Sequence, residues 1–338
     1  MQAATARLST ALMAAAGAAI LSLASVMAQA QSADARAAAE FPNKRVRILV
    51  GFAPGGTTDI TARVIAEKLQ AKWGQPVIVE NRPGGGSNIA ADVVAKSPPD
   101  GYTLALGVTG SHGINVSLYK NLPYHPLRDF EPITQGTLHP NAIFVHPNFP
   151  ANNIQELLAL ARREPGKLVF GHDGSGSGSH LAMELLLHRA GIKMTNVPYK
   201  GQPVLLTDVM GERLPVGVTG IPGVFAHYKS GKVKVLGLTS LQRTPAAPEL
   251  PTVAEQGFPG FAGEPWSGFF APKGTPKAIV DKIATDIIEI SRTPDVIKKM
   301  NDQGTRFVGS RPEEFRAFVA AEIDKWAEAV KASGATAD

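Results

Sequence analysis

The chain has 338 residues, of which 44% are hydrophobic and 19% charged, so it is long enough for two ordinary domains and apolar enough to form a core. Its formal charge is +5, from 34 basic and 29 acidic residues spread thinly along the sequence. Because there is no long run of Lys or Arg that could follow a phosphate backbone, nucleic-acid binding is not expected.

The sequence contains no cysteine. This excludes disulfide bonds, Cys nucleophiles, Cys-ligated zinc, iron-sulfur clusters and the acylated Cys of a bacterial lipoprotein, so no lipid anchor is expected. The eight histidines are scattered, without the i, i+4 pair and acidic neighbour of a helix-borne zinc site. We therefore expect no metal and no other cofactor.

The first 30 residues are typical of a secretory signal peptide. Arg7 is the only charge before Asp34, residues 8–28 are almost wholly apolar or small, and Ala28-Gln29-Ala30 forms a small-x-small cleavage site. A membrane anchor is the alternative, but the apolar part is rich in Ala rather than Leu and the cleavage site follows it at once. The mature protein is expected outside the cytoplasm.

From Val46 onward, short apolar runs alternate with segments of helical periodicity, which predicts βα units and a largely parallel sheet. The predicted strands cover residues 46–52, 77–79, 102–107, 142–146, 168–171, 214–218 and 234–239. The predicted helices start at Asp59 and cover residues 89–96, 154–164, 181–190 and 204–210.

The C-terminal quarter is predicted to be helical. Thr275-Pro276 and Thr293-Pro294 each place a hydroxyl that could cap a helix before a proline at the first helical position. A last helix is predicted over residues 312–332, with one apolar face that packs in the core.

Residues 51–59 form a Gly-rich turn between the first predicted strand and the first helix. Glycines allow backbone N–H groups to converge, and a helix N-terminus carries a partial positive charge, so a carboxylate could bind there without a basic side chain. A nucleotide is not expected, because Thr57 stands where a phosphate-binding P-loop needs Lys.

Residues 171–180 form a second Gly-rich turn, again between an apolar run and a helix. If the two turns belong to domains that face each other, both helix N-termini point into one cleft and can hold one anion. The alternative is a secreted hydrolase that uses a serine and His180 of residues 175–180. However, the pattern Gly-x-Ser-x-Gly is absent and no third catalytic group is identifiable, so an enzyme is not the favoured interpretation.

Several ordered motifs carry a resemblance to a known family. They are Phe52-Ala-Pro-Gly-Gly-Thr-Thr-Asp59, Val79-Glu-Asn-Arg-Pro-Gly84, Pro99-Asp-Gly-Tyr-Thr-Leu104, Gly178-Ser-His-Leu181, Val197-Pro-Tyr-Lys-Gly201, Leu250-Pro-Thr-Val-Ala-Glu255 and Ala271-Pro-Lys-Gly-Thr-Pro276. With these motifs the chain closely resembles the periplasmic solute-binding proteins of the tripartite tricarboxylate transporter family, called Bug receptors. The resemblance covers essentially the whole chain after the signal peptide.

The resemblance implies a type II periplasmic-binding-protein fold, in which two α/β domains are joined by crossing strands and close on a ligand about a hinge. The crossings are expected near residues 135–142 and 239, which gives a discontinuous domain 1 (41–138 and 240–338) and a domain 2 (139–239). The implied function is a periplasmic receptor that captures a dicarboxylate, a tricarboxylate or an aromatic acid and delivers it to integral membrane permease subunits. A signalling partner is the alternative, and the particular carboxylate and the oligomeric state are not predicted.

In this family the strand-to-helix turn of each domain holds a carboxylate through backbone N–H groups, small hydroxyls and ordered water. The resemblance therefore implies ligand-binding residues in the first turn, where Asp59 could equally cap its helix, and in the second turn, with three further candidates elsewhere. They are Phe52, Gly55, Gly56, Thr57, Thr58 and Asp59, then Ser175, Gly176, Ser177, Gly178, Ser179 and His180, and then Thr109, Ser111 and Tyr199. The segments 214–218 and Glu264-Pro265-Trp266 depart from the usual family pattern. The family therefore does not predict which ligand this wall of the cleft selects.

Overall fold

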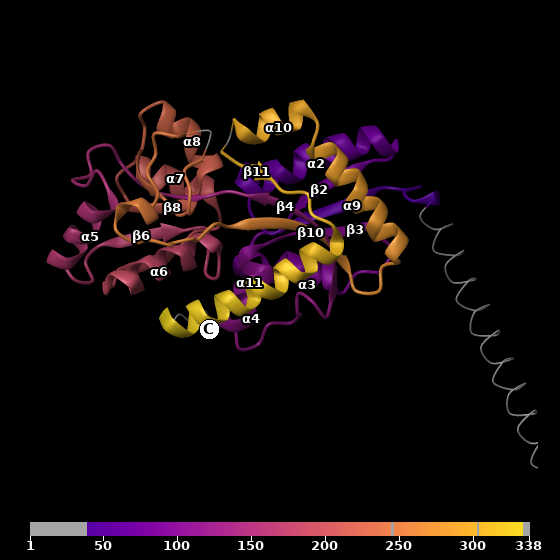
Figure 1. Cartoon of the computed structure of the whole chain (residues 1–338), viewed down its shortest axis with the longest axis horizontal. Helices are drawn as coiled ribbons and strands as arrows, with labels where there is room; N and C mark the ends of the chain where they lie inside the picture. Colours follow the sequence, from indigo (N-terminus) through magenta and orange to yellow (C-terminus); the bar gives the residue numbers. More distant parts are fainter. Residues whose placement is uncertain (1–38, 245–246, 303, 334–338) are drawn as a thin grey trace, which may run out of the picture.

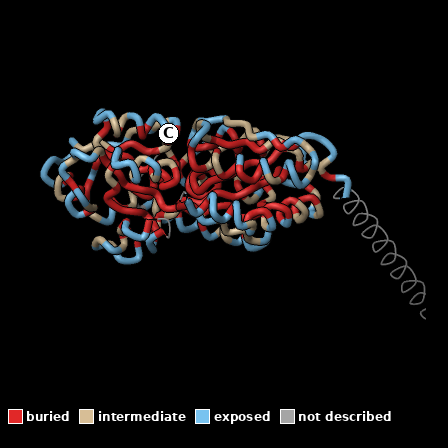
Figure 2. The backbone as a smooth tube through the Cα atoms, turned by 90° about the horizontal axis from the view of Figure 1, so that it is seen from above, coloured by how far each residue is buried: buried red, intermediate tan, exposed pale blue. Residues whose placement is uncertain are grey.

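The structure is a computed structural model that describes residues 39–244, 247–302 and 304–333. Within these residues the strands form two sheets, of six and five strands, in the two halves of an elongated molecule (Figure 1). Seen from above, buried backbone runs through the middle of both halves and exposed backbone surrounds it (Figure 2). We call the half with the six-stranded sheet the first half and the other the second half.

The first half is built on β1 (Val46–Val50), β2 (Val77–Asn81), β3 (Thr103–Val108), β4 (Phe130–Leu138), β10 (Trp266–Pro272) and β11 (Arg306–Phe307). Their order in the sheet is β11-β4-β10-β3-β1-β2, with β1, β2 and β3 parallel to one another and β10 antiparallel to both β3 and β4. The apolar residues of β1 alternate between two core clusters, because successive side chains of a strand point to opposite faces. Ile48 packs with one cluster and Leu49 with the other.

The helices of the first half cover both faces of its sheet. One face packs against α2 (Thr57–Trp73) and α9 (Lys277–Ser291), and the other packs against α3 (Asn88–Ala95) and α11 (Pro312–Ser333). Shorter helical elements are η1 (Gly85–Ser87), η2 (Gly110–Ile114), α4 (Asn115–Leu118) and α10 (Pro294–Asn301).

The second half is built on β5 (Asn141–Val145), β6 (Val169–His172), β7 (Thr195–Pro198), β8 (Val216–Gly220) and β9 (Lys234–Leu238), in the order β7-β6-β8-β5-β9. Helices α5 (Ile154–Arg163) and α6 (Gly178–Ala190) pack on one face. Helices α7 (Gln202–Met210) and α8 (Ile221–Lys229) pack on the other. Both sheets are therefore covered by helices on both faces, as the alternating sequence pattern predicts.

Three segments connect the halves. The chain passes from β4 to β5 through His139 and Pro140, and it returns from β9 to β10 through residues 239–265. Helix α11 runs along the first half, and its Trp326 and Val330 pack with Leu181 of α6 in a shared apolar cluster (Figure 1).

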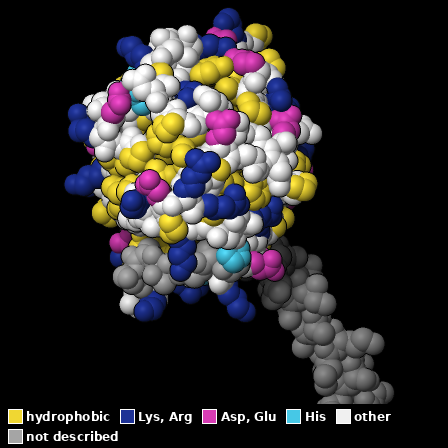
Figure 3. Space-filling view, turned by 90° about the vertical axis from the view of Figure 1, so that its left-hand side faces the viewer, with side chains coloured by type: hydrophobic (Ala, Val, Ile, Leu, Met, Phe, Trp, Pro, Cys, Tyr) yellow, Lys and Arg dark blue, Asp and Glu magenta, His cyan; other side chains and the backbone are white. Residues whose placement is uncertain are grey.

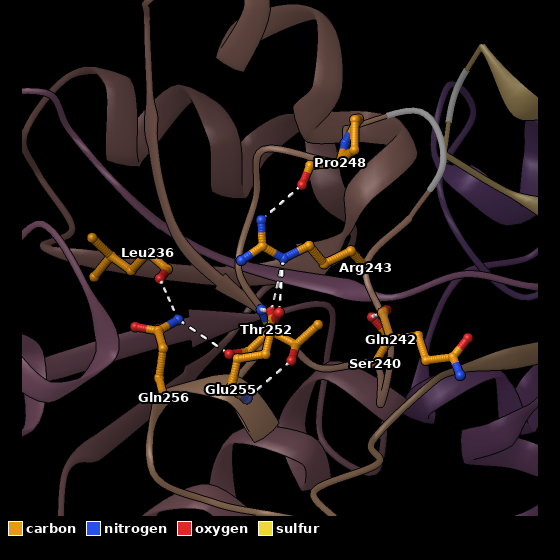
Figure 4. A network of polar contacts seen from close by, with 8 residues as sticks. All are labelled: Leu236, Ser240, Gln242, Arg243, Pro248, Thr252, Glu255 and Gln256. Atoms are coloured by element: carbon orange, nitrogen blue, oxygen red, sulfur yellow. Dashed lines mark hydrogen bonds and ion pairs between the residues drawn. The ribbon is translucent and has the colours of Figure 1, made fainter.

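A polar network holds the start of the returning segment to the second half (Figure 4). The Arg243 guanidinium donates to the Glu255 carboxylate at 2.9 Å and to the Pro248 carbonyl at 2.8 Å, and Gln256 Nε2 donates to the Leu236 carbonyl of β9 at 3.0 Å. The segment therefore stays with the second sheet through η3 (Ala254–Gln256) before it crosses. The domain limits expected at residues 139 and 239 stay predictions.

The predicted strands each agree with an observed strand to within two residues at either end. The sequence analysis did not identify β4, β7, β10, β11 or α8. Strand β4 contains Pro132 and Gly136 together with buried polar residues, and β7 is short and mostly exposed, so neither shows the apolar pattern of a strand.

The predicted hydroxyl caps of the C-terminal helices are wrong, although helices do follow both prolines. Helix α9 begins at Lys277, and the Thr275 hydroxyl donates to the Pro272 carbonyl at 2.8 Å instead. Thr293 is the N-cap residue of α10, but its hydroxyl donates to the Ile290 carbonyl at 2.8 Å. In both places the hydroxyl satisfies the carbonyl of a preceding turn rather than the helix N–H groups.

The surface at the free end of the second half carries charges of both signs. Lys and Arg side chains are interspersed with Asp and Glu on this face, and hydrophobic side chains lie between them (Figure 3). In the part of the chain that the structure describes, no helix has the length and apolar character needed to cross a membrane.

Candidate functional site

The first turn (residues 51–59) leaves the N-terminus of α2 without a cap from its own side chains. Gly56 is the N-cap residue, with extended backbone dihedrals and no side-chain hydrogen bond. The first helical hydrogen bond runs from the Ile60 N–H to the Gly56 carbonyl at 3.0 Å. In the described structure the N–H groups of Thr58 and Asp59 have no hydrogen-bond partner, which is the arrangement of a helix N-terminus that can accept an anion.

Asp59 braces the first turn from inside. Its carboxylate accepts hydrogen bonds from the Gly55 N–H, the Arg63 Nε–H and the Asn81 amide, each at 2.9 Å. Burial alone would raise the pKa of Asp59, but the hydrogen bonds from Arg63, Gly55 and Asn81 outweigh it and the pKa is lowered. Asp59 is therefore ionised and holds the glycines of the turn in place.

A side chain of the second half reaches the first turn. Gln202, the first residue of α7, accepts the Thr57 N–H through Oε1 at 2.9 Å and donates from Nε2 to the Gly220 carbonyl at 3.0 Å. Its amide also contacts the Thr57 hydroxyl, at 3.1 Å from Nε2. An oxygen of the opposite half thus occupies one of the N–H groups at the start of α2.

The second turn (residues 171–180) is tied together by its own side chains. Ser177 is the N-cap residue of α6, and its Oγ accepts the His180 N–H at 3.2 Å. The Asp173 carboxylate accepts the hydroxyls of Ser179 at 3.0 Å and of Thr219 at 2.7 Å. Burial raises the pKa of Asp173 to about 6, which these two hydroxyls only partly counteract.

The imidazoles of the second turn are not placed for nucleophilic catalysis. His180 Nδ1 accepts the Gly176 N–H at 3.2 Å, and its ring stacks on His172 with 4.3 Å between the ring centres. Burial, followed by the neighbouring His172, lowers the pKa of His180 to about 3, so the ring is neutral. Among the described contacts neither Ser177 nor Ser179 bonds to an imidazole nitrogen, so the hydrolase alternative gains no support from this geometry.

The halves meet closely around these turns. A Cβ built on Gly110 of η2 would lie 2.4 Å from the Gly176 carbonyl oxygen, and one built on Gly86 would lie 2.4 Å from the Ser175 carbonyl oxygen. Because such distances are too short for real Cβ atoms, only glycine allows this approach at either position. The structure is therefore a closed arrangement of the two halves.

A cavity of about 50 Å³, which we call the central cavity, lies between the two turns. Eight of the residues predicted from the sequence line it: Phe52, Gly56, Thr57, Thr58, Thr109, Ser177, Gly178 and Ser179. A water needs about 10–15 Å³ by this kind of measure, so the cavity has room for a few water-sized groups.

An adjoining cavity of about 370 Å³ shares Phe52 and Asp173 with the central cavity. Two more predicted residues, Ser175 and Tyr199, line it. The Tyr199 hydroxyl donates to Asp208 at 2.8 Å, and burial together with this carboxylate raises the pKa of Tyr199 to about 12.

The other predicted residues line neither cavity: Gly55, Asp59, Ser111, Gly176 and His180. Ser111 is fully buried behind the end of β3, and its hydroxyl contacts His112 Nδ1 at 2.8 Å. These residues shape the two turns and the strand end rather than the cavity wall.

Among the described residues of the central cavity wall there is no Lys or Arg, and the ionisable ones are Asp173 and His139. His139 lies between β4 and β5, and its Nδ1 is buried without a hydrogen-bond partner in the described structure. Burial lowers the pKa of His139 to about 4, so the ring is neutral at pH 7. Any anion in the cavity would be held by N–H groups and hydroxyls.

Comparison of the sequence with known proteins identifies its family. Residues 61–335 match the family model described as the tripartite tricarboxylate transporter family receptor. Protein BugT of Bordetella pertussis is 35% identical over 296 residues, which cover 87% of this chain and 91% of BugT. The chain belongs to this receptor family.

Solved structures of the family have the same fold as this receptor. R. palustris Rpa4515 with adipate is 34% identical, with a TM-score of 0.85 over 88% of this chain and 99% of that one. MatC from Rhodopseudomonas palustris with bound malate is 33% identical, with a TM-score of 0.82 over 86% of this chain and all of that one. The predicted periplasmic-binding-protein fold with two α/β halves is thereby confirmed.

Eight side chains of the central cavity wall were not predicted from the sequence: Ala53, Val108, His139, Asn141, Asp173, Gln202, Pro265 and Trp266. His139 and Pro265 lie on the segments that cross between the halves, and Asn141 and Trp266 directly follow those segments. The sequence indicated crossings near these positions but not which side chains line the cavity. Asp173 directly follows β6, at the carboxyl end of a parallel strand, and this position was the available signal.

Trp266 and Thr109, two residues of the central cavity wall, are hydrogen-bonded to each other. The Trp266 N–H donates to Thr109 Oγ1 at 2.7 Å, and the indole N–H donates to Glu322 of α11 at 2.8 Å. Glu322 also accepts the indole N–H of Trp326 at 2.8 Å. The wall contributed by β10 is thus held in one orientation by the C-terminal helix.

Proposed function

We propose that this receptor captures a small organic carboxylate between its two halves in the periplasm and presents the closed form to the membrane permease subunits of a tripartite tricarboxylate transporter. One observation carries the proposal. The N-termini of α2 and α6, from opposite halves, meet at one cavity, and the described residues of its wall include no Lys or Arg.

Helix N-termini can replace a basic side chain as the partner of an anion. Each carries about half a positive charge, and its first N–H groups are unpaired and point along the axis. Thr57 and Thr58 of α2 and Gly178 and Ser179 of α6 line the cavity. A carboxylate held from both sides stabilises the closed state, whereas an anion held by one turn binds the open and closed states equally.

Gln202 shows where a ligand oxygen would bind. Its Oε1 accepts the Thr57 N–H at 2.9 Å, and a carboxylate oxygen is a stronger acceptor for the same N–H because it is charged. In the proposed mechanism the ligand carboxylate displaces the Gln202 oxygen from Thr57. The side chain then remains available as a donor through its Nε2.

Two solved relatives support the chemical class of the ligand, since one was solved with adipate and the other with malate. Membership of the family supports delivery to a permease. The family and the sequence of residues 1–30, which lie outside the described residues, support a periplasmic location.

The direct test compares each acid with its neutral amide. Calorimetric titration of short mono- and dicarboxylates against the amides of the same acids should show binding of at least one acid and an affinity for its amide about tenfold weaker or less. Equal affinity for acid and amide would contradict a site built for a negative charge. Ester turnover that disappears in Ser177→Ala or Ser179→Ala would favour the hydrolase instead.

A further inference from the structure

Asp173 is a half-buried carboxylate in the wall of the proposed ligand site. It follows β6 at the carboxyl end of the strand, and its side chain lines both the central and the adjoining cavity. A ligand that reaches from one cavity to the other must pass this carboxylate. Its presence there is unexpected, because a site for anions should exclude negative side chains.

Asp173 can accept more hydrogen bonds than its neighbours donate to it. An ionised carboxylate offers about four acceptor positions. Ser179 Oγ lies 3.0 Å away, and Thr219 Oγ1 lies 2.7 and 2.8 Å from the two carboxylate oxygens, but each hydroxyl has one proton to donate. At most two hydrogen bonds therefore reach Asp173 from these residues.

No cation compensates the charge in the described structure. Asp173 takes part in none of its ion pairs, and the lining of the central cavity contributes no Lys or Arg. Lys200 lines the adjoining cavity, but it is exposed and forms no ion pair with Asp173. A half-buried carboxylate without a cation still loses part of its hydration, and Asn would satisfy the same two hydroxyls without that cost. The charge is therefore best explained by a ligand that neutralises it.

We propose that Asp173 selects ligands in which the carboxylate is accompanied by an ammonium group, so that the N-termini of α2 and α6 hold the carboxylate and Asp173 holds the ammonium. This inference rests on the proposed function and specifies its substrate class as small zwitterionic acids. His139, whose Nδ1 is buried and unpartnered in the described structure, adds a polar group to the same cavity wall. A second carboxylate beside Asp173 would instead meet like charge without a cation.

The test uses ligands that differ in one substituent. Calorimetric titration at pH 7.5 compares alanine, lactate and propionate, and separately aspartate, malate and succinate. Within each set the three acids differ only in the group on one carbon, which is an ammonium, a hydroxyl or a hydrogen. In at least one set the amino member should bind about tenfold or more tightly than the unsubstituted member, since hydrogen bonds between charged groups are the strong ones. A preference for propionate and succinate over their amino partners would overturn the inference.

The matched variant is Asp173→Asn, which keeps the shape and can still bond to the two hydroxyls. We expect it to remove the preference for the amino member while the affinity for the unsubstituted acid stays the same or increases. The control variant is Asp281→Asn, which changes an exposed carboxylate of α9 that pairs with Lys277. It should leave every affinity unchanged. Melting of each ligand-free variant shows that it is folded. An amino preference that persists in Asp173→Asn would also overturn the inference.

The pH dependence of the wild-type receptor gives an independent measurement. Between pH 8 and pH 5, binding of the amino acid should weaken as Asp173 takes up a proton, while binding of the unsubstituted acid should not weaken. The neighbouring imidazoles of His139, His172 and His180 remain neutral over this range, because burial lowers their pKa values to about 4, 4 and 3. Glu184 of α6, whose pKa burial raises, is controlled for with Glu184→Gln.

The two proposals fail in different ways. If no acid of either set binds, the carboxylate receptor itself is contradicted. If the acids bind but show no amino preference that depends on Asp173, only the substrate class is contradicted.

Discussion

The first and second turns occupy the same position in their halves, between a parallel strand and a helix. The N-terminus of the helix that follows is capped differently in the two halves. Helix α2 begins after Gly56 without a side-chain cap, and its Thr57 N–H is bonded to Gln202 of the opposite half. Helix α6 begins after Ser177, whose own hydroxyl caps it, and the same turn carries the half-buried Asp173.

This difference assigns separate tasks to two turns that look alike in sequence. The first turn offers N–H groups to an oxygen from outside its own half and contributes no charge of its own to the cavity wall, because Asp59 points inward to Gly55, Arg63 and Asn81. The second turn is bonded internally through Ser177, Ser179 and His180, and it contributes the Asp173 carboxylate to the cavity wall. We infer that the first turn mainly holds the carboxylate and that the second discriminates among carboxylates by what else they carry.

The largest effect is expected from Gly110→Ala, which should break the contact between the halves. The added Cβ would lie 2.4 Å from the Gly176 carbonyl, so the closed state is blocked while each half folds as before. Ligand affinity should fall about a hundredfold or more, and the radius of gyration from small-angle scattering should increase.

The matched control for that variant is Gly113→Ala on the same element, where the nearest atom to the new Cβ is 3.5 Å away. It should bind ligand like the wild type. Normal binding by Gly110→Ala would mean that the ligand does not require the closed arrangement.

A change at Gln202 tests whether the first turn is the anion site. Gln202→Glu is nearly isosteric and places a permanent carboxylate where the Gln202 oxygen accepts the Thr57 N–H. The new side-chain carboxylate should occupy the proposed ligand site. It should weaken carboxylate binding about tenfold or more, because the ligand must displace a charged group and approach like charge. Gln202→Ala removes the competitor and should stay closer to the wild-type affinity in the same calorimetric titration. An unchanged affinity in Gln202→Glu would place the anion elsewhere.

Asp173 should make the stability of the ligand-free receptor depend on pH. Burial raises its folded-state pKa to about 6, above the ordinary value of 3.8, so the folded state binds the proton more tightly and loses stability as pH rises from 4 to above 6. The stability of the Asp173→Asn variant should not fall in this way as pH rises, because Asn does not titrate. The variant should be more stable than the wild type at pH 7.5 by up to about 3 kcal/mol and should lose that advantage near pH 4. Urea unfolding at both pH values measures it, and a variant that is less stable at pH 7.5 would show that the charge supports the fold.

The smallest effect is expected from Ser177→Ala, which removes the side-chain cap of α6. It should lower the free energy of unfolding by about 1 kcal/mol in urea titration. Loss of an ester-hydrolysing activity in this variant, with unchanged stability, would reverse the assignment of Ser177 as a capping residue.

The sequence predicts the parallel strands and both turns, because short apolar runs and Gly-rich strand-to-helix connections are local patterns. It does not predict β4 and β10, because polar residues, Gly and Pro are buried along these two neighbouring strands of the first sheet and interrupt the local apolar pattern. The same holds for the site. Thr57 and Ser177 follow from their turns, whereas His139 and Gln202 reach the cavity because distant segments pack together.

Resonances of individual amides test the central claim most directly. In a titration of ¹⁵N-labelled receptor with a carboxylate that binds, the amide protons of Thr57 and Thr58 and those of Gly178 and Ser179 should shift downfield together, at the same ligand concentration. Shifts confined to one turn, or to residues outside both, would contradict a carboxylate held between two helix N-termini.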